Sequence, residues 1–317
     1  MPMPISTAES TPITSSDLKA SRLVGDLLKR CAFSPAARRV DLAVSGGADS
    51  SALLVLAVAA GLEAHAFHVD HGLRAGSDLE ARRVGELAGR LGARFTSLTA
   101  AVTDGPDLEA RAREVRHGAL PEGVLFGHTM DDLAETVLLR IMRGTGPGGL
   151  ASMRYDRHPI LGLRRSETVA LCRELSIAVV DDPSNLEPRF RRNRVRHEVL
   201  PLLGDVADRD VTPLIARLAH QSAEQADLID ELARDLDASD ARALAATHRV
   251  LAAVAIRHWW SDSTGDPYPP DSAAIERILG VAHGSAVSCQ VHSGWVIRRT
   301  GQRLRIERDD TPEGTSR

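Results

Sequence analysis

Between residues 40 and 143 the chain alternates short apolar segments with longer amphipathic ones, and this alternation limits its folds more than any other feature. The short segments have the apolar character of buried strands, and the longer ones repeat apolar residues at helical spacing. Strands are expected at Val40–Val44, Ala64–Val69, Arg94–Leu98 and Gly123–Phe126. Helices are expected at Asp49–Ala60, Ser77–Leu91, Asp107–Leu120 and Asp131–Arg143, the last two beginning at aspartates that can cap them. Alternating strands and helices build parallel sheets with right-handed crossovers, so we predict an α/β fold with a doubly wound parallel sheet.

The pattern changes after Asp181, where an arginine-rich helix is expected to end near Pro201 and a long helix to cover Thr212–Leu236. Further helices are expected at Asp240–Trp260 and near Ala273–Val281. Three short strands separated by turn residues are expected at Ala286–Val291, Trp295–Arg299 and Arg303–Glu307. These elements predict a second, smaller helical or α+β C-terminal domain with an antiparallel sheet.

The 317 residues suffice for about two domains. We predict a disordered tail at residues 1–16, a sheet domain at 17–202, linker helices at 203–239, a small domain at 240–310 and a second tail at 311–317. Residues 1–16 lack an apolar core segment and contain no arginine, so they resemble neither a secretory signal nor a transit peptide.

Composition indicates a soluble globular protein, with 43% apolar and 26% charged residues. The longest apolar run, Ser51–Gly61, is too short to span a bilayer, so no membrane association is expected. Cys31, Cys172 and Cys289 are widely scattered and form neither a zinc spacing nor a disulfide framework. A reducing, cytoplasmic location is therefore expected. The oligomeric state stays open between a monomer and a homodimer.

Arginine supplies nearly all of the positive charge, because only Lys19 and Lys29 of the 39 basic residues are lysines. The formal net charge of -4 argues against a uniformly basic surface that binds any polyanion. Five arginines nevertheless fall within eight residues, from Arg189 to Arg196. Such a cluster repels itself unless anions are near, so we favour contact with RNA phosphates or ATP phosphates over a solvated helix face.

The segment Ser45–Ser50, with the sequence SGGADS, follows the first predicted strand and opens the first helix. Unpaired N–H groups at a helix start bind anions, and the two glycines let the backbone approach a phosphate group closely. Asp49 is suited to hold a magnesium ion beside that phosphate, since magnesium prefers carboxylate and phosphate oxygens. The alternative, a glycine turn with a capping serine, leaves Asp49 and Ser50 unexplained.

Two better-known phosphate loops do not fit the sequence. A P-loop of the G-x-x-x-x-G-K-[ST] type needs a lysine, and both lysines lie upstream of every glycine-rich turn. Gly144–Gly149 matches G-x-G-x-x-G, but it follows a predicted helix, whereas a dinucleotide-binding loop must follow a strand.

Asp70 and His128 follow the second and fourth predicted strands, and ligands of open parallel sheets bind at these carboxyl ends. For Asp70 a turn or helix cap remains as plausible as nucleotide contact. Asp131 and Asp132 lie in a first helical turn, where acidic residues are favoured in any case. Glu135, one turn later, is compatible with a side chain that simply faces solvent.

Ser45–Ser50 resembles the signature loop of the N-type ATP pyrophosphatases, or PP-loop proteins, which release AMP and pyrophosphate. Further motifs resemble the tRNA(Ile)-lysidine synthase family within that group, over about Leu23–Pro201. They are HVDHGLR at 68–74, GHTMDDLAET at 127–136, the continuation Arg143–Met153, DPSN at 182–185 and RRNRVRHEVLP at 191–201. Thr129 and Leu133 depart from the family pattern, which usually has histidine and glutamine there.

The resemblance implies that residues 17–202 form a PP-loop ATP-binding catalytic domain and that residues 240–310 contact tRNA. It implies ATP-dependent attachment of L-lysine to C2 of the wobble cytidine of an isoleucine tRNA. The C2 oxygen would attack the α-phosphorus of ATP, and the lysine amine would then displace AMP. ATP and magnesium are the implied cofactors, and the tRNA(Ile) anticodon stem-loop and L-lysine the implied partners.

The resemblance also implies residue roles. ATP would be bound by Ser45, Gly46, Gly47, Ala48, Asp49, Ser50 and Asp70, with the metal held by Asp49. The catalytic candidates are Asp49, Arg113, Arg116, His128, Asp132 and Arg194. Arg113, Arg116 or Arg194 would oppose the developing charge, and His128 or Asp132 would accept a proton. tRNA would be bound by Arg191, Arg192, Asn193 and Arg196.

Two other functions remain open on the sequence alone. One is a different PP-loop ATP pyrophosphatase, such as an amide-forming synthetase. The other is a noncatalytic RNA-binding module. The arginine cluster and the lack of a glutaminase-like segment argue against the synthetase, and tRNA-dependent ATP–pyrophosphate exchange would separate all three.

Overall fold

A computed structural model of the chain describes residues 11–70, 77–99, 118–151, 153–180, 187, 189–292 and 294–308. The chain divides into two compact units, Met1–Gln221 and Ser222–Arg317. The boundary falls within helix α11 (Thr212–Arg234), so the predicted linker at 203–239 is not a separate segment but is shared between the units.

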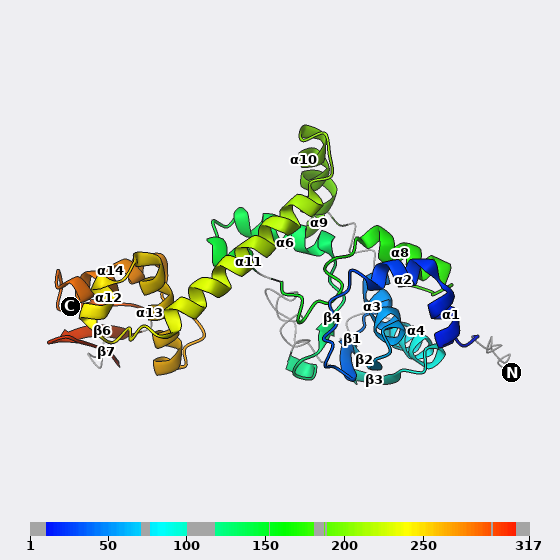
Figure 1. Ribbon diagram of the computed structural model, residues 1–317, viewed down its shortest axis with the longest axis horizontal. Coiled ribbons are helices and arrows are strands. Elements are labelled where there is room, and N and C mark those ends of the chain that lie inside the picture. Colours follow the sequence, from blue (N-terminus) through cyan, green and yellow to red (C-terminus); the bar gives the residue numbers. More distant parts are fainter. Residues whose placement is uncertain are drawn as a thin grey trace, which may run out of the picture. The chain divides into compact units, whose positions relative to one another are not determined.

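The first unit contains a four-stranded parallel sheet (Figure 1). Its strands are β1 (Arg39–Ala43), β2 (Glu63–Asp70), β3 (Arg94–Thr99) and β4 (Leu125–Phe126), in the order β3-β2-β1-β4. All three pairings are parallel, which confirms the predicted α/β sheet. The direction of strand addition reverses between β1 and β4, and the carboxyl edge of such a reversal is where open α/β sheets bind ligands.

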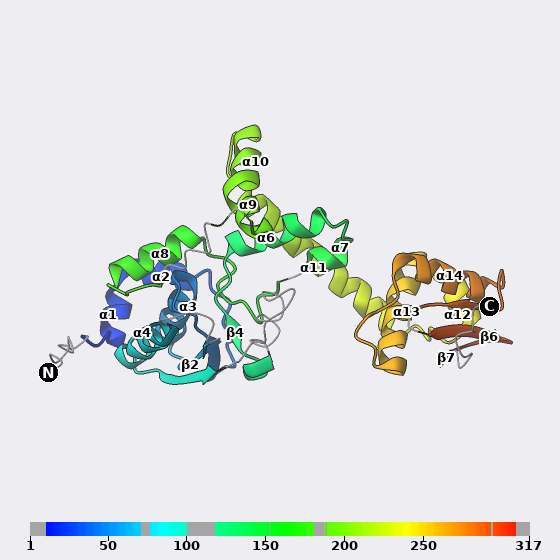
Figure 2. The same ribbon diagram turned by 180° about the vertical axis from the view of Figure 1, so that it is seen from behind.

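Helix α3 (Ala48–Ala59) forms the centre of this unit's core. Every residue from Ser50 to Ala57 is buried, so this helix is apolar on all sides and packs between the sheet and other helices. Helices α1 (Ser15–Ala20), α2 (Arg22–Leu28), α4 (Ser77–Arg90) and α8 (Arg165–Glu174) surround it (Figures 1 and 2).

Two parts of this unit differ from the sequence prediction. The predicted tail at 1–16 is too long, because Ile13 is buried and Thr14 caps α1 with a capping box. Helix α8 was not predicted. Its first turn contributes Arg165 and Thr168 to the site described below.

Helix α6 (Met130–Ile141) begins one residue before the predicted Asp131. Thr129 is its cap, and Asp132 accepts hydrogen bonds from the N–H and the hydroxyl of Thr129. Leu133 packs in a small apolar core with Val137, Leu161 and Ala219. The two departures from the family pattern therefore have structural roles here, as a helix cap and a core residue.

The arginine-rich segment does not end at Pro201 as predicted. It runs as α9 (Arg191–Arg194), a π-helical turn η2 (Val195–Val199) and α10 (Leu200–Val206). Proline disrupts a regular helix because it lacks an N–H and collides with the carbonyl four residues earlier. A preceding π-turn changes that spacing, and Pro201 lies in the first turn of α10, where proline is tolerated. The short helix α7 (Pro147–Leu150) follows α6.

The second unit combines helices with the predicted antiparallel sheet. Its elements are α12 (Ala241–Ala246), α13 (Arg249–Thr264), α14 (Ser272–His283), β5 (Ser288–Gln290), β6 (Trp295–Thr300) and β7 (Arg303–Arg308). The strands pair antiparallel in the order β5-β6-β7, as expected. The single helix predicted at Asp240–Trp260 is wrong, because Thr247 is extended and ends α12 while His248 caps α13.

Within the described ranges, no helix is both long enough and apolar enough to cross a membrane. The three cysteines are free thiols.

Candidate active site

The loop Ser45–Ser50 lies at the carboxyl edge of β1 and leads into α3. Gly46 has a φ of +90°, a conformation that favours glycine, and its carbonyl accepts a hydrogen bond from the N–H of Val180 at 2.9 Å. The Ser50 hydroxyl accepts from the Ser45 N–H at 3.2 Å and donates to the Gly47 carbonyl at 3.1 Å. Gly47 is the N-cap, and no side chain caps the N–H groups of the first turn of α3. The loop is thus held open with helix N–H groups available to an anion.

Gly127 brings the second motif against this loop. A Cβ atom at position 127 would lie 2.8 Å from the Ser50 Cα and 2.9 Å from the Asp49 carbonyl oxygen. Real Cβ atoms do not approach backbone this closely, so only glycine fits. The motifs at 45–50 and 127–136, far apart in sequence, form one site at the point where β1 and β4 adjoin.

Asp49 points toward α8 and is largely buried. It accepts hydrogen bonds from the Thr168 hydroxyl and from Arg165 Nε, the latter at 3.2 Å. Burial and the nearby Asp132 raise the pKa of Asp49, while Arg165 and Thr168 act against that rise. The site therefore favours a partner that neutralises the Asp49 carboxylate.

Arg165 joins three carboxylates from two helices. Besides Asp49, its guanidinium donates to Asp132 Oδ1 at 2.7 Å and to Glu135 Oε1 at 3.2 Å. Burial lowers the pKa of Arg165, but the three carboxylates outweigh burial and raise it. Arg165 is thus a permanent cation at the centre of the site.

Glu135 does not face solvent, although its position in the helix was compatible with that. Its side chain is 0% exposed and accepts hydrogen bonds from Arg165, Arg192 and Arg196. The shortest is from Arg196 Nε at 2.6 Å. Glu135 lies one turn beyond Asp131 and Asp132, so all three carboxylates project toward the same side of α6.

Asp132 is strongly held in its ionised form. Burial raises its pKa, but Arg165 and Arg192 outweigh burial, and the pKa falls to about 2. Arg192 Nη2 donates to Asp132 Oδ1 at 2.9 Å. A carboxylate with so low a pKa is a poor proton acceptor at neutral pH, which leaves His128 as the better of the two predicted candidates.

The arginine cluster splits into two faces. Arg192 and Arg196, four residues apart, point into the site at Asp132 and Glu135. Arg194 points to solvent and pairs with Glu198, its Nη2 lying 2.9 Å from Glu198 Oε2, and Arg191 is exposed. Asn193 is buried, and its side-chain amide donates to the Glu187 carbonyl at 3.0 Å. The anions nearest the cluster are therefore carboxylates of the chain itself, and the predicted tRNA and catalytic roles of these residues stay predictions.

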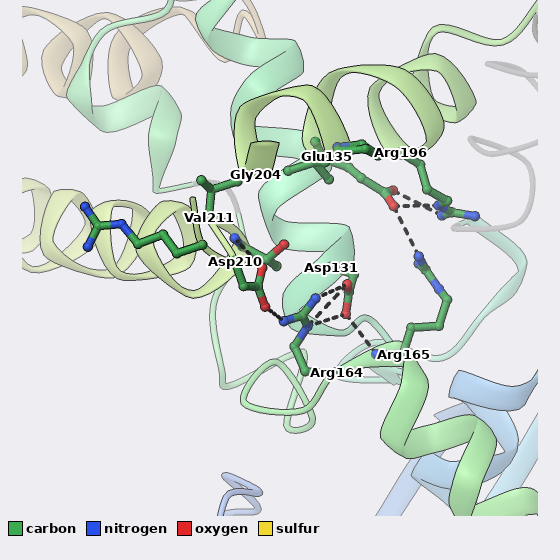
Figure 3. A pocket seen from close by; sticks show the side chains of 12 residues that line it. Asp131, Glu135, Arg164, Arg165, Arg196, Gly204, Asp210 and Val211 are labelled. Carbon is green, nitrogen blue, oxygen red and sulfur yellow. Dashed lines mark hydrogen bonds and ion pairs between the residues drawn. The ribbon is translucent and has the colours of Figure 1, made fainter. Parts of the chain in front are cut away.

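A cavity of about 430 Å³ opens beside this network, lined mainly by residues of α6, α8, η2 and α10 and of the turn before α11 (Figure 3). Arg164 crosses it, donating to Asp131 Oδ1 at 3.0 Å and pairing with Asp210. Its lining holds arginine and carboxylate side chains together, as Figure 3 shows. Such a cavity suits a polar, zwitterionic or phosphate-bearing ligand.

His128 follows β4, and its Nδ1 lies 3.0 Å from the Nδ1 of His158. Asp70 is the last residue of β2, at the same carboxyl edge of the sheet. Arg113 and Arg116 lie outside the described residues, as do the segments 71–74 and 182–185 of the motifs.

No role was expected from the sequence for Arg165, Thr168 or His158, and Glu135 was expected only as a residue compatible with solvent exposure. A signal existed for Glu135, because it lies four residues after Asp131, and Arg192 and Arg196 have the same spacing in the arginine-rich segment. No comparable signal marked Arg165, since its partner Asp49 lies 116 residues earlier.

The model of the PP-loop domain family matches residues 17–203. A tRNA(Ile)-lysidine synthase from Rhodococcus erythropolis is 46% identical over 65% of this chain and 66% of that protein. One from Nocardia farcinica is 42% identical over 78% of this chain and 84% of that protein. Among solved structures, a U34-tRNA thiolase from Methanococcus maripaludis is 14% identical with a TM-score of 0.49, covering 64% of this chain and 78% of that one.

The match to the Rhodococcus protein falls just short of two thirds of its length, whereas the match to the Nocardia protein covers most of it. The family model spans the sheet, the loop Ser45–Ser50 and the whole acidic and arginine network. The chain therefore belongs to the tRNA(Ile)-lysidine synthase family of PP-loop proteins.

Proposed function

We propose that this protein uses ATP to attach L-lysine to C2 of the wobble cytidine, position 34, of the CAU-anticodon isoleucine tRNA. The C2 oxygen attacks the α-phosphorus of ATP, and pyrophosphate leaves. The lysine ε-amine then attacks C2, its proton passes to a base, the C2–O bond breaks and AMP leaves. An oxygen on a pyrimidine ring is a poor leaving group, and adenylation converts it into a good one.

One observation carries the proposal. Gly127 seats the histidine and acidic motif directly against the loop Ser45–Ser50, so a group that binds phosphate and groups that handle an RNA base and an amine share one site. Family membership supports ATP as the energy source.

The loop supports the first step. The uncapped N–H groups of α3 are suited to hold the departing pyrophosphate, and helix polarity favours negative charge there. Asp49 fits a magnesium ion, because its carboxylate lies in the first turn of α3 and its raised pKa is relieved by a cation. Magnesium, when bound, would neutralise charge on the phosphates.

The arginine network supports charge stabilisation in both steps. Arg192 and Arg196 reach the site, whereas Arg194 does not, so we assign the stabilising role to the first two in place of Arg194. Carboxylates already hold both arginine side chains in place, so neither side chain has to move when negative charge develops during the reaction. We assign proton acceptance in the second step to His128, since Asp132 has a pKa of about 2.

The small sheet of the second unit supports RNA binding. On one face, Arg298 of β6 lies directly opposite Arg305 of β7, and Arg303 lies opposite Thr300. Arg298 pairs with Glu307 and Arg303 with Asp237, but Arg305 has no acidic partner among the described residues. Arg305 faces a like charge across the sheet without an acidic partner of its own, and an RNA phosphate is suited to neutralise it.

A tRNA substrate implies a cytoplasmic protein. The test is incubation with ATP, magnesium, labelled lysine and an isoleucine-tRNA anticodon stem-loop, followed by mass measurement of the cytidine. The expected result is a lysine adduct that requires ATP, with release of AMP and pyrophosphate. No adduct, with RNA binding retained, would instead favour a noncatalytic module, and ammonia-dependent turnover would favour an amide-forming synthetase.

The variant Asp49→Asn tests the metal role. We expect RNA-dependent pyrophosphate release to disappear while the circular dichroism spectrum and unfolding transition remain those of a folded protein. The amide can still accept from Thr168. Retained pyrophosphate release would remove Asp49 from its assigned role.

A further inference from the structure

The His158 side chain lies beside His128, and nothing in the sequence motifs assigns it a role. We propose that His158 is a positioning residue for His128: the hydrogen bond between their Nδ1 atoms fixes which His128 nitrogen exchanges a proton with substrate and stabilises His128 once it is protonated. This inference rests on the proposed function and deepens it.

Two backbone hydrogen bonds hold the two histidines together. The Phe126 N–H donates to the Arg157 carbonyl at 2.9 Å, and the Met130 N–H donates to the Leu163 carbonyl at 2.9 Å. The segment 157–163 is thereby fastened alongside residues 126–130. The two imidazole rings meet edge to face, with centroids 4.7 Å apart and planes at 70°. The Phe126 ring packs against both imidazoles, with its centroid 5.9 Å from that of His128 and 5.7 Å from that of His158.

Proton counting limits the states of this pair. At 3.0 Å, the two Nδ1 atoms share one proton, because two N–H groups aimed at each other would collide. The pair therefore carries at most one positive charge. His128 Nδ1 is occupied by this bond, so any proton that His128 takes from substrate enters at Nε2.

The surroundings decide which ring becomes charged. Burial, and next the charge of His128, lower the pKa of His158 to about 4. Arg157 acts in the same direction, whereas Asp156 and Asp132 act against it. His158 is thus neutral near pH 7, and its Nδ1 can accept from a protonated His128. A hydrogen bond from a charged donor is stronger than one between neutral groups, so this contact favours the protonated form of His128.

The proton path follows. As the carbon–nitrogen bond to C2 forms, the proton of the lysine amine enters His128 at Nε2. The proton on His128 Nδ1 stays on His128 and remains hydrogen-bonded to His158 Nδ1, while the C2–O bond breaks and AMP leaves. His158 changes neither its charge nor its proton count. It acts only through His128.

Two substitutions separate this role from simple packing. His158→Asn retains an amide oxygen near the position of Nδ1 and so retains an acceptor. His158→Phe retains a ring and removes the acceptor. His258→Phe, at a partly exposed histidine of the second unit, is the matched control for loss of an imidazole.

Three readouts are needed. The pKa of His128 is measured on the free protein by nitrogen-15 spectra of labelled histidines, assigned with a His128→Asn sample. Pyrophosphate release measures the first step. Single-turnover transfer of lysine to isolated adenylated RNA measures the second step. We expect His158→Phe to lower the His128 pKa by about one unit, a tenfold change in protonation, since hydrogen bonds to charged groups have that order of strength.

We also expect His158→Phe to slow lysine transfer by about tenfold or more, the low end of general-base effects, while pyrophosphate release stays at the control level. His158→Asn should restore both the pKa and lysine transfer. An unchanged His128 pKa in His158→Phe would overturn the inference, and so would a folded His158→Asn that behaves like His158→Phe. Failure of the wild-type protein to transfer lysine, with the pKa shift present, would overturn the proposed function instead.

Discussion

Gly127 touches the backbone of Ser50 so closely that no other residue fits: an added Cβ would be 2.8 Å from the Ser50 Cα and 2.9 Å from its nitrogen. This contact joins the end of β4 to the first turn of α3. The phosphate loop and the histidine and acidic motif are therefore one rigid unit.

We predict that Gly127→Ala displaces the loop. Overpacking against backbone costs about 1–3 kcal/mol of unfolding free energy, and RNA-dependent pyrophosphate release should be lost. Gly25→Ala in α2 is the control, because nothing lies within 4 Å of its added Cβ. That helical substitution should stabilise the protein by about 0.5–1 kcal/mol. Equal behaviour of the two variants in urea unfolding and activity would contradict the contact.

Arg165 is the cation that three carboxylates share, and two of these carboxylates, Asp132 and Glu135, are buried. We predict that Arg165→Met destabilises the protein by about 3–5 kcal/mol, since removal of one partner leaves buried charges uncompensated. Arg173→Met, at an exposed position on the same helix, should change the free energy of unfolding by less than about 0.5 kcal/mol. Urea denaturation of both variants measures the difference. A small effect of Arg165→Met would show that Arg192 and Arg196 neutralise the site without it.

Asp132 should make stability depend on pH in the acid range. Its pKa of about 2 lies below the ordinary value of 3.8, so the folded state binds this proton more weakly than the unfolded chain does. The resulting stabilisation is fully present above pH 3.8 and is lost as the pH falls toward 2. The stability gap between the wild-type protein and Asp132→Asn should narrow over that window, as urea midpoints at successive pH values will measure. A gap that stays constant would mean that Asp132 is not held ionised by its arginines.

The arginine face of the small sheet should contribute phosphate contacts. We predict that Arg298→Glu with Arg305→Glu weakens stem-loop or whole-tRNA binding and reduces the slope of log affinity against log salt by about 2, roughly one for each lost contact. Arg22→Glu with Arg173→Glu, at two exposed positions of the first unit, is the control with the same change in net charge. Fluorescence anisotropy at several salt concentrations measures both. An unchanged salt slope in the double variant would exclude this face from the RNA interface.

Local sequence explains much of what was predicted correctly. The strands around Leu42 and Ala66 and the helix after Gly47 follow from short-range periodicity and a glycine turn. The errors lie where local signals compete. Thr247 adopts an extended backbone conformation and so ends a helix within a continuous apolar pattern. At Pro201 the chain stays helical, because a π-helical turn precedes it.

The sequence by itself determined the parallel sheet, the phosphate loop at its carboxyl edge and the candidate motifs, because each depends on residues adjacent in the chain. Only the tertiary structure decided that Arg165 and Thr168 hold Asp49, that Glu135 is buried among three arginines and that His158 pairs with His128. These partners are separated by 30 to 119 residues. The fold alone brings them within hydrogen-bonding distance, and burial then fixes which side chains carry charge.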